Sequence, residues 1–225
     1  VAGAPVAAAL TRRGFGALVP NAGGRAVPFA LEGLERSAPL AGASWTQRGL
    51  LLVTSAGELL RCDGHSPDAE SATWQCASPG EEFVKLPVPK NAELLAAAVA
   101  EHVEGAMLAL IYKHMPTVVG LFRAAAGAWH PAGEVHVPPQ KGEAGVHLAF
   151  GGEGEELIMA TGSGEVLRRR LSMGRIGENV PVPAASYGSA RELRAACTTH
   201  EGDLLRLALR RNDGGNAWRP ELLAA

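Results

Sequence analysis

The stretch Thr54-Ser55-Ala56-Gly57-Glu58-Leu59-Leu60-Arg61 decides how this chain folds, because it recurs. The pattern T-x-x-G-E-[LV]-L-R returns intact at residues 161–168, and again at residues 199–206 with Asp203 in place of the glutamate. Each copy lies between two apolar runs, and its glycine tolerates the positive φ of a tight turn. This is the pattern of a β-hairpin. Three similar hairpins in one chain predict a repeat protein.

Connectors that contain proline give a second, independent marker of the repeat. They are separated by 34, 50, 50 and 44 residues, at Pro5, Pro39, Pro89, Pro139 and Pro183. The turn glycines average just under 45 residues a step if one degenerate copy is allowed, at Gly23, Gly57, Gly164 and Gly202. Both markers predict five units, with approximate bounds 5–38, 39–88, 89–138, 139–183 and 184–225.

Each unit is predicted to consist of short strands. We expect three strands in the first unit, at 6–11, 15–20 and 25–31. We expect four strands in each of the others. They lie at 40–46, 50–54, 58–62 and 72–77 in the second unit, at 94–103, 106–114, 117–124 and 129–137 in the third, at 146–150, 156–161, 165–171 and 179–182 in the fourth, and at 184–187, 193–199, 203–210 and 217–223 in the fifth. A helix competes only at residues 92–104, which are rich in the helix formers Ala, Leu and Glu. Its place in the repeat favours a strand.

The composition agrees with many short strands in one domain. Of the 225 residues, 47% are apolar and 20% are charged, which is typical of a globular chain. The 28 glycines and 15 prolines punctuate short apolar runs and argue against long helices. We therefore predict an all-β fold with a single domain over residues 1–225.

Four short antiparallel strands in each of five units resemble a β-propeller, in which radial stacking leaves only short, protected edges. One tryptophan begins the fourth strand in three units, at Trp74, Trp129 and Trp218. The resemblance is generic, because the Gly-His and Trp-Asp pairs of WD40 repeats and the regular double glycine of kelch repeats are absent. Five-bladed lectins similar to tachylectin share the size and period. The rival architectures are a pair of β-sandwiches or a six-bladed ring with one degenerate unit.

The charge distribution argues against nucleic acid and anionic membranes as partners. The formal net charge is −2, and the longest block of like charge is Arg168-Arg169-Arg170. Binding by counterion release needs a more concentrated basic surface. No apolar run approaches the roughly 18 residues of a membrane span. Val1 in place of a methionine fits a cleaved leader or a trimmed protein, and slightly favours an exported or lumenal location.

No residue pattern predicts a catalytic, cofactor-binding or metal site. In the repeated motif the acid and the arginine are three positions apart, so they point to opposite faces of a strand and indicate a framework role. The first predicted strand of each unit would line the centre of a propeller, and among these strands only Glu101 offers a carboxylate, whereas glycoside hydrolysis needs two. The glycine-rich residues 151–154 precede a strand rather than a phosphate-binding helix. The histidines match no metal motif, at His65, His102, His114, His130, His136, His147 and His200.

The three cysteines divide into a pair and a single residue. Cys62 and Cys76 end one predicted strand and lie inside the next, so they could face each other and form a disulfide. Free thiols are equally compatible with the sequence. Cys197 is interpreted as a small buried residue.

These observations favour a non-catalytic interaction scaffold or an accessory subunit of a larger assembly, whose partners are other proteins. A glycan-binding propeller is the alternative, and a propeller hydrolase is the third hypothesis. Fold alone does not name the partner, because propeller function resides in the loops of one face.

The turns between second and third strands, and the connectors between units, are expected to open on one face. Stiff connectors with apolar side chains would order cheaply on binding. The candidate partner residues are therefore Val88, Pro89, Pro139, Val182 and Pro183. The opposite face is expected to carry longer, polar loops at 63–71 and 174–179. The alternative is that the prolines only terminate strands and block edge pairing.

Overall fold

A computed structural model of the chain contains strands and turns, and no α-helix in the residues that it describes. These residues are 5–20, 27–34, 38–46, 49–64, 72–78, 85–102, 105–137, 147–151, 154–161, 165–172, 175–180, 191–198, 204–211 and 218–224.

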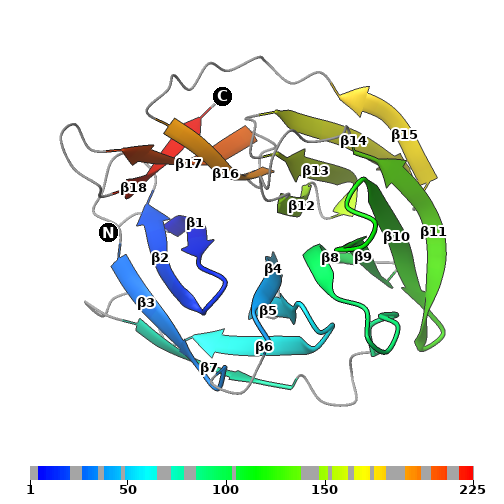
Figure 1. The fold of residues 1–225 in the computed structure, drawn as a ribbon, viewed down its shortest axis with the longest axis horizontal. Helices are drawn as coiled ribbons and strands as arrows, with labels where there is room; N and C mark the ends of the chain where they lie inside the picture. Colours follow the sequence, from blue (N-terminus) through cyan, green and yellow to red (C-terminus); the bar gives the residue numbers. More distant parts are fainter. Residues whose placement is uncertain are drawn as a thin grey trace.

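The first seven strands form a single sheet in the order β1-β2-β3-β7-β6-β5-β4 (Figure 1). Their bounds are β1 Pro5–Leu10, β2 Phe15–Pro20, β3 Val27–Glu32, β4 Leu40–Thr46, β5 Gly49–Thr54, β6 Leu59–Gly64 and β7 Ala72–Ala77. All neighbours are antiparallel except β3 and β7, which pair in parallel from Phe29↔Ala72 to Glu32↔Gln75. The sheet therefore spans both of the first two predicted units.

The remaining strands form three further antiparallel sheets. The sheet β11-β10-β9-β8 contains β8 Leu94–His102, β9 Gly105–Tyr112, β10 Val118–Ala125 and β11 Ala128–His136. The sheet β12-β13-β14-β15 contains β12 His147–Gly151, β13 Glu156–Ala160, β14 Val166–Ser172 and β15 Arg175–Val180. The last contains β16 Arg191–Thr198, β17 Leu204–Arg211 and β18 Trp218–Ala224.

Buried side chains of three sheets show that the sheets stack face to face. In β5, Leu50 and Leu52 belong to one buried cluster, whereas Leu51 and Val53 belong to another that they share with β9. Alternate residues of β9 in turn belong to a third cluster, which they share with β13. A strand covered on both faces needs apolar residues at every position. This explains the continuous apolar runs in β5, β9 and β13.

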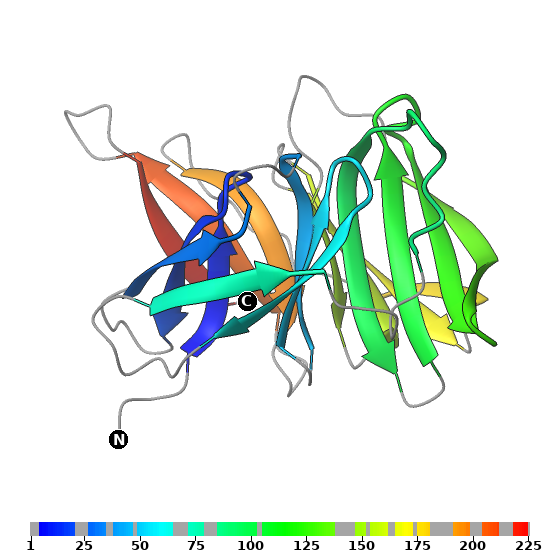
Figure 2. The ribbon, with the colours of Figure 1, turned by 90° about the horizontal axis from the view of Figure 1, so that it is seen from below.

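The stacked sheets surround a centre, and strands β1, β4, β8, β12 and β16 lie nearest to it (Figure 1), while Figure 2 shows the sheets from the side. This is the β-propeller fold that the repeat predicted. The blade number and the blade boundaries remain predictions.

Three names are used below for the buried clusters. The β5–β9 cluster contains Leu51, Val53, Leu86, Leu94, Ala97, Val99, Leu108 and Leu110. The β9–β13 cluster is built from the other faces of β8, β9 and β10 with β12, β13 and Leu171. The cystine cluster contains Phe29, Leu31, Leu40, Leu50, Leu52, Cys62, Trp74 and Cys76, all from the seven-stranded sheet.

Most strand positions agree with the sequence prediction to within two residues. Residues 94–102 form β8, so the strand prediction is confirmed where a helix competed. The polar loop expected at residues 174–179 was wrong, because residues 175–180 form β15. This strand pairs with β14 alone among the described strands and lies at the sheet edge, so it lacks an apolar pattern. The strand expected at residues 184–187 lies outside the described residues.

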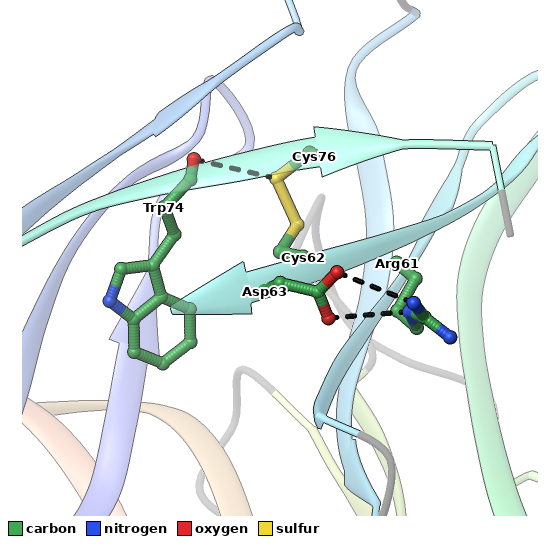
Figure 3. The surroundings of a disulfide bond; sticks show 5 residues. All are labelled: Arg61, Cys62, Asp63, Trp74 and Cys76. Carbon is green, nitrogen blue, oxygen red and sulfur yellow. Dashed lines mark hydrogen bonds and ion pairs between the residues drawn. A yellow bond between two sulfur atoms is a disulfide. The ribbon is translucent and has the colours of Figure 1, made fainter. Parts of the chain in front are cut away.

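Cys62 and Cys76 are directly opposite each other in the β6–β7 ladder, and their sulfur atoms are bonded (Figure 3). Their Cα atoms are 4.0 Å apart. Of the two possibilities that the sequence left open, the structure has the disulfide. Cys197 is on β16.

The inner strands β4 and β8 approach each other closely because they carry small residues. Of the nine residues of β8, the five at positions 96–100 are four alanines and one valine. Opposite them, a Cβ at Gly42 would overlap the backbone carbonyl of Ala97. The Ser44 hydroxyl accepts a hydrogen bond from the Val99 N–H at 2.9 Å. Larger side chains here would push the two sheets apart.

Gly42→Ala is therefore expected to destabilise the protein by about 1–3 kcal/mol, because overpacking against a backbone cannot be relieved by a rotamer change. Gly120→Ala in β10 is the matched control, since its Cβ would first meet the edge of the Phe122 ring at 3.2 Å. Urea denaturation of both variants measures the difference. Equal losses would contradict the close approach of β4 and β8.

Candidate functional site

The turn of the repeated motif is fixed by a buried threonine. The Oγ1 of Thr54 accepts a hydrogen bond from the Glu58 N–H at 3.0 Å, and the Thr54 N–H donates to the Glu58 carbonyl at 2.9 Å. Thr161 and Glu165 repeat both bonds, at 3.1 and 2.9 Å. Gly57 has a φ of 81°, which explains the glycine of the motif. The third copy, at Thr199, lies outside the described residues.

Ser55 joins this turn to the segments before and after it in the chain. Its N–H donates to the carbonyl of Pro39 at 2.6 Å, just before β4. Its carbonyl accepts from the N–H of Leu94 at 2.8 Å, at the start of β8. The turn and the connectors therefore lie at the same end of the sheets, as the sequence predicted for this pair of units.

The connector between the second and third units packs under the same turn. Leu86 is buried in the β5–β9 cluster, and Val88 packs against that cluster and beneath Gly57. The hydroxyl of Tyr112 donates to the Pro87 carbonyl at 3.1 Å, and burial raises the pKa of that hydroxyl. Pro89 is exposed. The connector is thus anchored through its first half and exposed in its second.

The third unit shows how the degenerate copy of the motif is accommodated. Tyr112 occupies the position of Thr54, and the Lys113 N–H donates to the Glu93 carbonyl at 2.8 Å, as Ser55 does to Pro39. The Nζ of Lys113 also bonds the Glu93 carboxylate at 3.0 Å. The turn that follows is exposed, and Met115 at its centre is 42% exposed. The third unit therefore lacks the threonine of the motif, but it keeps the backbone hydrogen bond between the turn and the connector.

We call the exposed surface at this end of the sheets the connector face, and define it by Ala56, Pro89, Lys90, Asn91, Lys113, His114, Met115, Pro116 and Thr117. Of the predicted partner residues it includes Pro89. Val88 is half-buried, and Pro139, Val182 and Pro183 lie outside the described residues. The sequence placed the turn at Met115 and Pro116 on this face but did not count Met115 among the partner residues, because a single methionine in a turn has no periodic signal.

The charged residues of the motif form ion pairs rather than a catalytic pair. Arg168 reaches Glu156 on the neighbouring strand β13, with an Nη2–Oε2 distance of 2.5 Å. Arg61 pairs with Asp63 two residues later on β6, at 3.3 Å (Figure 3). In both copies the arginine of these ion pairs binds a carboxylate other than the acid of its own motif. The framework interpretation of these residues is supported.

The histidines remain dispersed among the described residues. His114, His130 and His136 are exposed. His147 on the inner strand β12 has a buried Nδ1 without a hydrogen-bond partner, and burial lowers its pKa from 6.5 to about 4. Within the described ranges, no three His, Cys, Asp or Glu side chains are grouped as a metal site. Glu101 is partly buried on β8.

Two of the three repeated tryptophans serve packing. Trp74 is 5% exposed, stacks on Phe29 with ring centroids 5.0 Å apart, and contacts Trp45 edge to face at 5.2 Å. Trp129 is partly buried against the β5–β9 cluster. Trp218 lies on β18, and its side chain is outside the described part of the chain. Trp45, at 62% exposure, is the more accessible indole.

No protein-family model and no curated protein matches the chain. Among solved structures, the β-propeller domain of Cps50 (Swd1) from Myceliophteria thermophila is 12% identical, with a TM-score of 0.41 over 100% of this chain and 72% of that one. A candidate 6-phosphogluconolactonase from Bacteroides uniformis is 12% identical, with a TM-score of 0.44 over 96% and 70%. The WD40 propeller domain of Doa1 is 10% identical, with a TM-score of 0.36 over 92% and 87%. Likenesses this distant carry no argument about function.

The structure has no helix in its described ranges with the length and hydropathy to cross a membrane.

Thr54→Val is expected to destabilise the protein by about 1 kcal/mol, because it removes the acceptor of the Glu58 N–H while keeping the side-chain volume. Thr161→Val is expected to behave in the same way. Thr117→Val, at an exposed turn position, is the control and should change little. Thermal unfolding compares the three, and an effect of Thr117→Val equal to the others would refute the role of the buried hydroxyl.

Stability is also expected to fall in acid through His147. Its folded pKa of about 4 lies below the unfolded value of 6.5, so between these values the unfolded chain binds a proton that the folded chain does not. The contribution is complete above pH 6.5 and is lost as the pH falls toward 4, by at most about 1.4 kcal/mol per unit. His147→Asn should flatten the urea midpoint between pH 7.5 and 4.5, whereas His114→Asn should not. Identical profiles for wild type and His147→Asn would exclude this residue.

Proposed function

We propose that this protein is a non-catalytic β-propeller that acts as an interaction scaffold or accessory subunit, and that a protein partner binds its connector face. The observation that carries the proposal is the backbone connection at Ser55 and Lys113, which fixes the turns against the connectors before any partner arrives. The exposed side chains of this surface are both apolar and polar, and protein interfaces combine the two kinds.

A fixed surface favours binding because less entropy is lost there. Ordering a mobile side chain on association costs roughly 0.5–1.5 kcal/mol, and ordering a loop costs more. Pro89 and Pro116 have no N–H to desolvate, and they stiffen the two segments on which they lie. Met115, directly before Pro116, is exposed and adaptable, so it suits a contact with a partner.

The glycan alternative has less support. It would use one aromatic platform per blade, but Trp74 is a core residue and Trp129 packs against the β5–β9 cluster. The hydrolase alternative would need two carboxylates facing each other, and the carboxylate of Glu156 is already paired with Arg168.

Met115→Asp is expected to remove the partner. In a native purification of the tagged full chain, the wild type should elute with a stoichiometric partner chain, and the variant as a free protein with unchanged thermal stability. Ala126→Asp is the matched control: it places the same charge on an exposed turn of the same sheet, between β10 and β11, at the other end of the strands.

Val88→Asp is not a suitable test of binding, because Val88 packs against the core and a charge there should unfold the blade. A wild-type protein that elutes alone, or a partner lost equally with Ala126→Asp, would overturn the proposal. Turnover of a sugar or a lactone by the wild type would support the enzyme hypothesis instead.

A further inference from the structure

We propose that the Cys62–Cys76 disulfide is a redox latch: its reduction by a dithiol releases strands β1–β3 from the ring while the rest of the propeller stays folded. The proposal is independent of the connector face. It rests on the place of β7 in the seven-stranded sheet, on the composition of the cystine cluster, and on the burial of the two sulfur atoms.

Strand β7 is the element that ties β1–β3 to the rest of the propeller. Among the described strands, the pairing of β3 with β7 is the one ladder between the first three strands and any other strand. It spans four residue pairs, Phe29↔Ala72 to Glu32↔Gln75. One backbone bond adds to it, from the Leu40 N–H to the Arg12 carbonyl at 2.9 Å. A short parallel ladder of this kind is weak by itself.

On its other side, β7 is held by β6 through a ladder of equal length and by the disulfide within it. The paired residues run from Arg61↔Ala77 to Gly64↔Trp74, with Cys62↔Cys76 inside. Gly33, just after β3, packs directly on the carbonyl of Cys76. The disulfide therefore fixes the same backbone on which β3 and the following turn rest.

The hydrophobic contacts of β3 depend on the same place. Phe29 and Leu31 are buried in the cystine cluster together with Trp74, Cys62 and Cys76. Among the residues whose burial the structure describes, neither of the other two buried clusters contains a residue of β3. Loosening β7 thus removes the ladder and the buried contacts of β3, the strand through which β1 and β2 are paired to the rest of the sheet. It leaves the β5–β9 and β9–β13 clusters with their own contacts.

The chemistry balances with a dithiol as reductant. One thiolate of the dithiol attacks a protein sulfur, the Cys62–Cys76 bond breaks, and the second thiolate resolves the mixed disulfide. Two electrons pass to the protein, which gains two thiols, while the dithiol becomes a disulfide. Cys62 and Cys76 are only 1% and 8% exposed, so the attack requires that β7 first separates locally. Reduction and release of β1–β3 are therefore one coupled event.

Amide hydrogen exchange of the full chain, before and after reduction with dithiothreitol in native buffer, tests the latch. Closing a loop with a sequence separation of 14 shifts an opening equilibrium by about a hundredfold. We expect amides in residues 5–34 and 72–77 to exchange up to about a hundredfold faster after reduction. Amides in residues 105–125 should keep their rates.

Two variants serve as controls. The double variant Cys62→Ser/Cys76→Ser should exchange like the reduced wild type and should not respond to dithiothreitol, whereas Cys197→Ser should keep the full response. Equal acceleration in residues 105–125 would show that reduction unfolds the whole ring and would overturn the proposal. Unchanged exchange in residues 5–34, or failure of dithiothreitol to generate two thiols under native conditions, would overturn it as well.

Discussion

The hydrogen bond from the Glu58 N–H to the Thr54 hydroxyl is the interaction on which the turn of the repeated motif depends. It closes the turn in the middle of the hairpin, and the closed turn presents the backbone of Ser55 to Pro39 and Leu94. One buried hydroxyl therefore fixes a hairpin and the junction between two successive units. This explains why the motif keeps its threonine and glycine, while the residues between them vary. Where Tyr112 replaces the threonine, Lys113 makes the corresponding backbone bond to Glu93, so the junction is the constraint that the chain retains.

Strands such as β5 and β9 could be predicted from the sequence because they are covered on both faces. A strand such as β5 must be apolar at every position, and turns must interrupt it, so runs and glycines together mark its ends. The same argument identified β8 as a strand although its composition favours a helix. Alanine is chosen there because β4 passes too close for larger side chains, with Gly42 against Ala97. Helix propensity was overridden by packing.

What could not be predicted lies at the edges and depends on contacts distant in sequence. The outer strand β15 has no apolar pattern, because its exposed edge imposes none. The parallel pairing of β3 with β7 joins residues 43 positions apart. Nothing in the sequence of either strand indicates that its edge pairs with the other strand rather than facing solvent. For the candidate site, the sequence located the end of the sheets that carries the connectors. It did not show that Val88 is packed while Pro89 is exposed, because Val88 is covered by the turn at Gly57, which is far from it in the sequence.

The two halves of the ring are thus held in different ways. The sheet β11-β10-β9-β8 is covered on one face by the β5–β9 cluster and on the other by the β9–β13 cluster, so removing a single contact leaves many others. In the part of the chain that the structure describes, β3 has one buried cluster and one short ladder to β7, and the covalent bond lies where both meet. A disulfide contributes most where non-covalent contacts are fewest, since it replaces the apolar area that a small element cannot bury. Its position in this fold follows from that imbalance rather than from the repeat, because no equivalent cysteine pair occurs in the other units of the sequence.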